Sequence, residues 1–408
     1  MSNTKTVTRW PRLLLGAISL LFAGIIYAWS VIKSPFGSGG FGWSNSALGL
    51  NYTITMCMFC LGGLFSGLLA KKVSVKVRMT ASAVLIAAGM FITSLLDGSN
   101  PALLYVGYGL MMGLGVGIVY NIVVALTNAW FPDKKGVASG VLMMTFGFSS
   151  LLFGKIADYM FSTEIGWSNT YRILGIAIGI VTLVVGLLIR GPKEDEIAPF
   201  LAAVKSKKSG AAAAEEKDYT AGEMLKRSSF WKLFVFFVLL TAVGGVALSF
   251  GKDIFLSVNV ESTLAVTIAS FLAIFNGVGR LCSGAIFDAL GIRRTQFVTS
   301  AVVIGASALT TIGIAVNSSV LSIIGVCLCA FSYGFAPTVS AAFAGAFYGR
   351  KNFALNFSIL NLILIPSAFY STVAGSIVDS TGGFLVVFII LTVFSVIGLI
   401  DNIFIKRP

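Results

Sequence analysis

About twelve apolar segments, each of roughly 20 residues or more, constrain the fold of this chain most strongly. Hydrophobic residues make up 57% of its 408 residues and charged residues only 11%, with a mean hydropathy of +0.93. A soluble protein of this size would not carry so apolar a surface. We therefore expect an all-α polytopic membrane protein. The expected spans lie near residues 11–34, 46–70, 79–97, 101–130, 137–160, 170–190, 230–256, 262–287, 296–316, 319–348, 353–378 and 383–405.

A charged stretch rich in small residues separates the first six spans from the last six. It contains four consecutive alanines at 211–214 between clusters of Lys and Glu, a composition typical of a linker between two bundles. Its basic residues also suit contact with anionic lipid headgroups. We expect an N-terminal six-helix bundle at 1–190, a cytoplasmic linker at 191–229 and a C-terminal six-helix bundle at 230–408.

The basic residues predict the orientation in the membrane. Most of the 29 Lys and Arg residues fall before span 1, in the loops after spans 2, 4, 8 and 10, in the linker and at the C-terminal end. These positions share one side, and positive loop residues favour the cytoplasmic side. We expect a multi-pass protein of the cell inner membrane with both termini in the cytoplasm. Topology thus explains the net charge of +13 without a nucleic-acid partner.

Several classes of function lack the residues they would need. The chain has no His, and although Cys57 and Cys60 have C-x-x-C spacing, no second ligand pair accompanies them, so we expect no metal and no cofactor. An enzyme would need a nucleophile, an acid–base pair or a metal cluster within the membrane, and we expect no enzymatic activity. A nutrient sensor that binds without transport would be expected to carry a long cytoplasmic output domain.

Arg280 is the basic residue that lies in the middle of an expected span. A guanidinium stays protonated at physiological pH, and placing it at mid-bilayer costs from roughly 3 to above 10 kcal/mol. Such a residue is a functional-site hypothesis by default. No Asp or Glu lies at comparable depth in the sequence, so the expected partner is a substrate carboxylate held by two parallel hydrogen bonds. The alternative is a structural contact with helix carbonyls.

The two halves repeat a pattern about 220 residues apart. Ala28–Phe36 at the end of span 1 resembles Ala247–Phe255 at the end of span 7, and Gly154–Asp158 resembles Gly375–Asp379. In transporters built from such parallel repeats, the binding site lies near the bilayer midplane between the halves. Arg280 has no counterpart in the first half, so we expect it to serve function rather than the repeated scaffold.

Three motifs resemble those of a known transporter group. Gly284–Arg294 resembles the loop signature of the major facilitator superfamily, and Trp130–Gly140 and Phe275–Arg280 are similar to motifs of its bacterial oxalate/formate antiporter and monocarboxylate transporter families. The resemblance implies the major facilitator fold, with twelve transmembrane helices in two six-helix bundles, working as a monomer.

The resemblance also implies a binding site. In these families the Arg of the Phe275–Arg280 motif binds the substrate carboxylate, and three tyrosines form an aromatic box. A Tyr combines an apolar face with a hydroxyl donor, which suits a small carboxylate. The alternative is that the tyrosine hydroxyls tie helices together or lie at the membrane interface. The expected substrate-binding residues are Arg280, Asn276, Tyr120, Tyr333, Tyr27, Phe357 and Asn361, with Asn356 nearby.

Two departures from the family pattern narrow the substrate class and leave the coupling open. The oxalate carrier has a second cation where this chain has Leu360, and no Lys or Arg occurs from Asn352 to Asp379. Two carboxylates would need two cations, so a monocarboxylate such as lactate, pyruvate, formate or acetate fits better. Proton-linked monocarboxylate carriers resemble the chain but have an Asp at the position of Asn276, which takes no proton.

Charged residues near the span ends are candidates for gating and coupling. Asp288 in the loop signature can latch the cytoplasmic side, although the first-half copy of the motif has Lys71 in place of the acid. For the three near the outer ends, the alternative is a solvated span end. The expected gating and coupling residues are Asp288, Arg293, Arg294, Lys33, Lys252 and Asp253.

The sequence thus predicts a secondary transporter of small monocarboxylates of the lactate and pyruvate type, coupled to protons and working by alternating access. Its expected partners are a small carboxylate, protons and membrane lipids. An organic-anion exchanger of the oxalate:formate type is the alternative, and a carrier for a sugar or a cationic drug is a more distant one.

Overall fold

The computed structural model describes residues 9–407, apart from 71, 132–134, 194, 201–217, 350–351, 353–355 and 357–358. The side chains of 135–137, 139–140, 288, 341 and 345 are also outside the described set. The described residues are helical almost throughout and contain no strand. They include 12 helices long and apolar enough to cross a membrane, which confirms the expected all-α polytopic fold.

The helices follow the apolar segments of the sequence. In the first half they are α1 (Trp10–Ala23), η1 (Gly24–Ala28), α2 (Trp29–Ile32), η2 (Ser34–Phe36), α3 (Asn45–Leu68), α4 (Val75–Thr93), α5 (Ala102–Leu104), η3 (Tyr105–Met112), α6 (Gly113–Trp130), α7 (Lys135–Phe161) and α8 (Gly166–Leu188). In the second half they are α10 (Ala221–Leu225), α11 (Ser228–Ser257), α12 (Ser262–Ala315), α13 (Ser319–Tyr333), α14 (Phe335–Tyr348), η4 (Asn361–Ile363), α16 (Leu364–Thr381) and α17 (Leu385–Ile403).

The eighth and ninth spans join more tightly than expected. The ninth span starts at Ala289 rather than near residue 296, and α12 contains both spans with one non-helical residue, Gly291, at φ 72°. This left-handed conformation is readily adopted by Gly because it has no Cβ. The expected loop is therefore a kink at a single residue.

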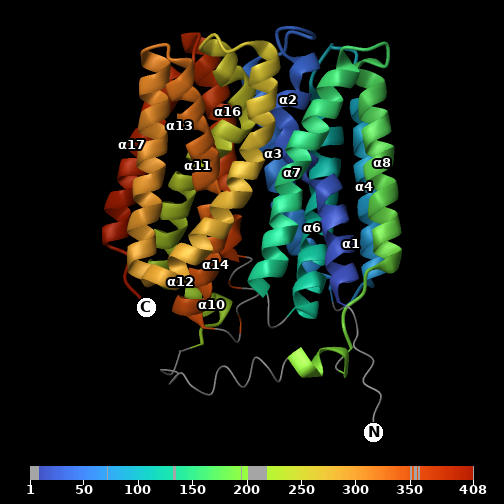
Figure 1. The fold of residues 1–408 in the computed structure, drawn as a ribbon, viewed down its shortest axis with the longest axis vertical. Helices are drawn as coiled ribbons and strands as arrows, with labels where there is room; N and C mark the ends of the chain where they lie inside the picture. The colour runs from blue at the N-terminus through green and yellow to red at the C-terminus, as the bar shows by residue number, and fades with distance from the viewer. Residues whose placement is uncertain are drawn as a thin grey trace.

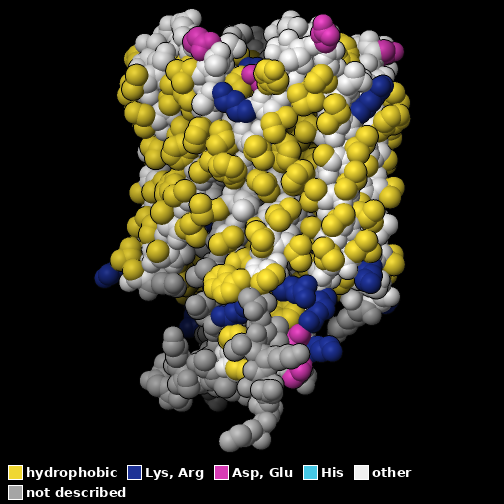
Figure 2. Space-filling model, turned by 45° about the vertical axis from the view of Figure 1, so that its right-hand side comes forward, with side chains coloured by type: hydrophobic (Ala, Val, Ile, Leu, Met, Phe, Trp, Pro, Cys, Tyr) yellow, Lys and Arg dark blue, Asp and Glu magenta, His cyan; other side chains and the backbone are white. Residues whose placement is uncertain are grey.

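Figure 1 shows the two halves side by side, with α1–α8 in blue to green and α11–α17 in olive to red. The start of α1 and the end of α17 lie at the same end of the molecule, which is also the end where α10 lies. Side chains of Lys and Arg gather there, while apolar side chains cover the middle of the face in Figure 2. The domain limits at residues 190 and 230 stay a prediction; α11 begins at Ser228.

Glycines allow helices of the two halves to meet at backbone distance. The halves contact each other mainly through α3 with α16 and α7 with α12. A Cβ added to Gly49 on α3 would lie 2.4 Å from the carbonyl oxygen of Ser371 on α16, and one added to Gly375 would lie 2.4 Å from that of Asn45. These distances leave no room for a side chain, so the two glycines determine how closely α3 and α16 cross.

Several spans are broken near their middle, and proline explains two of the breaks. A proline within a helix clashes with the carbonyl four residues earlier and removes one backbone hydrogen bond. Pro337 places this defect at Tyr333, where α13 ends, and Pro366 places it at Leu362, within η4. Span 1 narrows to the 3-10 helix η1, which contains Tyr27. Two of the predicted site tyrosines therefore lie at helix breaks.

Candidate functional site

Arg280 on α12 lies half-buried against the first half of the molecule. Its Nη1 contacts the sulfur of Met143 on α7, and its Nη2 donates to the hydroxyl of Tyr27 on η1 at 3.5 Å. Its Nε is buried without a hydrogen-bond partner. Within the described part of the chain, Arg280 forms no ion pair with an acid. The guanidinium is thus held by neutral groups, and its charge is left for another partner to balance.

An aromatic wall surrounds this guanidinium on the side of the first half. The ring of Phe146 is 5.4 Å from that of Tyr27 and 5.3 Å from that of Tyr120, and the ring of Phe59 is 5.2 Å from that of Tyr120. The hydroxyl of Tyr120 donates to the same sulfur of Met143 at 3.2 Å. The structure therefore brings Tyr27 and Tyr120 together with Arg280, as the sequence predicted.

Met143, Phe59 and Phe146 were missed by sequence reasoning. Each is an apolar residue in an apolar span, and nothing in the local pattern separates it from residues that face lipid. The family motifs also do not mark them. Their role depends on which face of α3 and α7 turns inward, which only the packing of the helices decides.

Asn276 and Tyr333 complete the second-half side of the site. Asn276 lies one helical turn before Arg280, is 2% exposed, and has a buried side-chain oxygen without a hydrogen-bond partner. Tyr333 is 3% exposed and interacts electrostatically with both Arg280 and Tyr27. A Cβ on Gly334 would lie 2.1 Å from the carbonyl oxygen of Asn276, so the break after α13 rests directly on the α12 turn that carries the site.

The described contacts of the residues expected from span 11 do not include Arg280. Asn356 donates through Nδ2 to the carbonyl of Tyr219 at 3.0 Å, so its amide turns toward the segment before α10 rather than toward Arg280. Asn361 begins η4 and is half-buried, with no described contact to Arg280. Phe357 lies outside the described residues. The assignment of Asn361 and Phe357 to the site stays a prediction.

A buried ion pair joins the two halves at the end opposite α10. Lys33, just after α2, is 3% exposed, and its ammonium lies 2.6 Å from a carboxylate oxygen of Asp253 on α11. The ammonium also lies 4.1 Å from the centre of the Phe250 ring. Beside it, Lys252 donates to the hydroxyl of Ser34 at 2.8 Å. The alternative of solvated span ends is therefore wrong for Lys33, because Asp253 and Phe250 supply a charge and a ring in place of water.

The same end carries a carboxylate that caps a helix of the other half. Asp379 on α16 accepts hydrogen bonds from the backbone N–H of Asn45 at 3.1 Å and of Ser46 at 2.9 Å, the first residues of α3. These N–H groups have no partner within their own helix, and the helix dipole favours an anion there. Ser46 and Ser376 add a hydroxyl contact at 3.1 Å. This end of the molecule is closed by contacts between the halves.

Of the gating residues expected on the cytoplasmic side, Arg293 has described partners, and they lie within its own half. Arg293 donates to the carbonyls of Asn402, Ile403 and Ile405 at 3.0–3.2 Å, so it caps the C-terminal end of α17 within its own half. Arg294 is exposed. The side chain of Asp288 lies outside the described set. A latch role for these three residues stays a prediction.

No group of three or more His, Cys, Asp or Glu that could hold a metal ion is found in the described ranges. At the candidate site, Arg280 supplies a positive charge, and Asn276 and the tyrosine hydroxyls supply hydrogen-bonding groups. Such a set of groups is chemically suited to an anion with an apolar part.

Known proteins similar to this chain include transporters. The chain is 27% identical to an uncharacterized MFS-type transporter, YhjX, of Escherichia coli (strain K12) over 366 residues, which are 87% of this chain and 84% of that protein. It is also 27% identical to the oxalate:formate antiporter of Oxalobacter formigenes over 300 residues, 72% of this chain and 67% of that protein.

Solved structures and a family model agree with this likeness. A bacterial homologue of the human lysosomal transporter Spinster, inward-facing and occupied, matches with a TM-score of 0.71 at 15% identity, covering 98% of this chain and 97% of that one. A D-xylose–proton symporter matches with a TM-score of 0.70 at 15% identity, covering 97% of each chain. The family model of the Major Facilitator Superfamily matches residues 13–364. This chain is therefore a multi-pass membrane protein of the major facilitator superfamily of transporters.

Proposed function

We propose that the protein transports small monocarboxylates and that Arg280 binds the substrate carboxylate. The observation that carries the proposal is a half-buried guanidinium whose described contacts are a sulfur and a hydroxyl, with no acid. A buried charge without a counter-charge is unfavourable. A carboxylate would supply the missing charge and two acceptors in the geometry that a guanidinium fits.

The surroundings favour a substrate with one carboxylate and a short carbon tail. The aromatic wall of Tyr27, Phe59, Tyr120 and Phe146 offers mostly apolar surface to the tail and hydroxyl groups to a substituent such as that of lactate. A dicarboxylate would need a second cation near Arg280. Lys33, a buried cation at the end of span 1, is already paired with Asp253.

Transport would proceed by alternating access, with the halves pivoting around Arg280. The contacts of Lys33, Asp253 and Asp379 would form the outer gate, because they join the halves at the end opposite α10. We place the protein in the cell inner membrane with both termini in the cytoplasm. We propose that it carries its substrate together with a proton. The carboxylate would balance the charge of Arg280, and a proton that moves with the monocarboxylate would make the transported pair electrically neutral.

Anion exchange is the second candidate. It is favoured by the likeness to a protein named as an oxalate:formate antiporter and by Asn276 at the position where proton-linked carriers have an acid. An exchanger would need no proton at the site, since an anion would occupy Arg280 in both directions of movement.

Uptake of radiolabelled L-lactate into proteoliposomes tests both candidates. Purified protein would be assayed with an inward proton gradient, with an internal anion load, and with neither. Arg280→Ala removes the cation, and Arg280→Lys keeps the charge but loses the two-pronged geometry. Arg172→Ala is the matched control, because Arg172 donates to Ser94 and has no described contact with a residue of the candidate site.

Loss of uptake in Arg280→Ala and a strong reduction in Arg280→Lys, with Arg172→Ala active, would support the site. Uptake driven by the proton gradient would support symport, and uptake that requires an internal anion would support exchange. Full activity of Arg280→Ala would overturn the role of Arg280. Absence of lactate uptake by the unmodified protein would move the substrate panel to formate, acetate and oxalate.

A further inference from the structure

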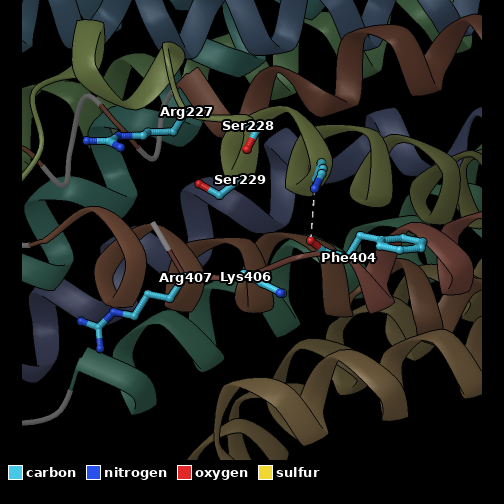
Figure 3. Close-up of a pocket in the computed structure, with 7 residues that line it drawn as sticks. Arg227, Ser228, Ser229, Phe404, Lys406 and Arg407 are labelled. Carbon is cyan, nitrogen blue, oxygen red and sulfur yellow. Dashed lines mark hydrogen bonds between the residues drawn. The ribbon is translucent and has the colours of Figure 1, made fainter.

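A cavity lies away from the candidate transport site, between the start of α11 and the end of α17 (Figure 3). Its volume is about 350 Å³, within the lower part of the range of roughly 300–1,000 Å³ usual for small-molecule sites. Both helix ends lie at the end of the molecule where α10 lies. The cavity is therefore located where a span leaves the membrane.

The lining of this cavity is strongly basic. Four of its seven lining residues are cations, Arg227, Lys232, Lys406 and Arg407, and the lining contains no acid. Figure 3 shows the side chains of Arg227 and Arg407 extending toward the same side from opposite walls. For these four cations, no ion pair is found among the residues that the structure describes.

Neighbouring groups leave most of this charge uncompensated. Lys232 donates to the carbonyl oxygen of Phe404 at 3.2 Å, and Asp401 acts on Lys232 electrostatically from outside the lining. The guanidinium of Arg227 lies 5.3 Å from the ring of Tyr219, a neutral partner. The described residues that line the cavity therefore carry four cations and no acid, so their net charge is positive.

The start of α11 adds hydrogen-bond donors to the same cavity. Ser228 and Ser229 are the first residues of this 30-residue helix, and both line the cavity. The N-cap residue, Arg227, gives no side-chain hydrogen bond to the first turn. The N-terminal N–H groups of a helix attract phosphate because they are unpaired and carry partial positive charge.

Exposed aromatic residues indicate that the cavity lies at the level of lipid headgroups. Phe404 lines it and is 59% exposed, and Trp231, one turn into α11, is 52% exposed with its indole N–H bonded to Leu225 at 2.9 Å. Aromatic side chains of this kind are enriched at the membrane interface. Basic pockets at this depth bind anionic headgroups.

We propose that this cavity binds the phosphate group of an anionic phospholipid, with Arg227 and Arg407 as its two main phosphate contacts. The cations would neutralise the phosphate, the start of α11 would donate to its oxygens, and Phe404 and Trp231 would lie beside the acyl chains. This site is independent of Arg280, so it stands or fails separately from the proposed transport function.

Native mass spectrometry of the purified full-length protein tests the proposal. The protein would be equilibrated in mixed micelles containing equal amounts of phosphatidylglycerol and phosphatidylcholine, and retained lipid would be counted. Arg227→Gln, Arg407→Gln and the double variant each remove cations from the cavity. Lys226→Gln is the matched control, because Lys226 is an exposed neighbour in sequence that does not line the cavity.

We expect selective retention of phosphatidylglycerol, reduced about fivefold by each cavity substitution and unchanged in Lys226→Gln. Equal retention of the two lipids, or equal losses in the cavity variants and the control, would overturn the proposal. In a second experiment, the melting temperature of each protein would be measured with and without inorganic phosphate. The same measurement reports whether the variants fold. Stabilisation by free phosphate that Arg227→Gln removes, without selectivity between the lipids, would assign the cavity to a soluble phosphate and reject the lipid.

Discussion

At the scale of single residues, the molecule contains two kinds of buried cation, one paired with an acid and one in contact with neutral groups. Lys33 has a carboxylate at 2.6 Å, whereas the described contacts of Arg280 are neutral. A paired cation contributes to holding helices together, while a buried cation without a counter-charge is a candidate binding site for an anion. Their local sequences do not reveal this difference, because Asp253 is more than two hundred positions from Lys33.

The hydroxyl of Tyr27 is expected to help Arg280 hold its substrate. Tyr27→Phe keeps the ring against Phe146 but removes the acceptor for Nη2 of Arg280. A hydrogen bond to a charged group contributes on the order of 1–2 kcal/mol, so the KM for lactate should rise roughly 5- to 30-fold. Uptake kinetics in proteoliposomes measure this change. Tyr159→Phe, at a 70% exposed position on α7, should leave the KM unchanged.

The pair of Lys33 and Asp253 should respond unequally to loss of its two members. Asp253→Asn leaves the 3% exposed ammonium of Lys33 without a counter-charge, which costs up to about 3–5 kcal/mol. Lys33→Met leaves Asp253, 32% exposed, able to reach water. We expect the larger fall in melting temperature for Asp253→Asn in detergent. Equal or reversed shifts would contradict the difference in exposure as the cause, and no shift in either variant would mean that the pair contributes little to stability.

At the scale of elements, helix breaks and glycine contacts position the site. Pro337 ends α13 at Tyr333, and Gly334 allows the broken segment to rest on the backbone of Asn276. Span 1 changes to a 3-10 helix at Tyr27. Backbone groups at such breaks lie beside the binding residues, as is usual in transporters. Apolar periodicity alone would predict that these two spans are continuous straight helices.

Close crossing of α3 and α16 should be necessary for transport. In Gly375→Ala the added Cβ would meet the backbone oxygen of Asn45 at 2.4 Å, a contact that side-chain rotation cannot relieve. We expect a marked loss of lactate uptake with normal insertion in the membrane, because the outer side could not close. Gly383→Ala is the control, since nothing lies within 4 Å of an added Cβ there. Equal uptake by the two variants would contradict this role for the crossing.

At the scale of the whole molecule, the two halves are joined at one end by contacts that differ in chemistry. An ion pair, a helix cap and a hydroxyl pair connect residues from opposite halves. Each of these contacts is modest alone, and together they stabilise a state closed at the end opposite α10. The alternating access proposed above would require these contacts to break once in each cycle.

A reversible cross-link should stop that cycle. The hydroxyl oxygens of Ser46 and Ser376 are 3.1 Å apart, so a Ser46→Cys, Ser376→Cys protein should form a disulfide on mild oxidation. Uptake should fall to near the background of empty liposomes and return after reduction. Each single-cysteine variant, treated identically, should stay active. Undiminished transport by the oxidised double variant, with the cross-link verified by mass, would show that this end does not need to open.

The sequence by itself determined the number of the spans and singled out Arg280 as the candidate substrate-binding residue. Apolar length is a local property, and an arginine in an apolar span is conspicuous whatever its neighbours are. The tyrosines at 27, 120 and 333 were reached through family motifs, and the first two contact Arg280 or its partner Met143.

Only the tertiary structure decided which groups meet. The aromatic wall, the partner of Lys33, the cap provided by Asp379 and the basic cavity between α11 and α17 all join residues far apart in the chain. Asn356 shows the converse, since it turns to the backbone of Tyr219. Apolar patterning specifies that a helix crosses the membrane, but lipid and protein interior are both apolar, so the face that turns inward is set by packing against other helices.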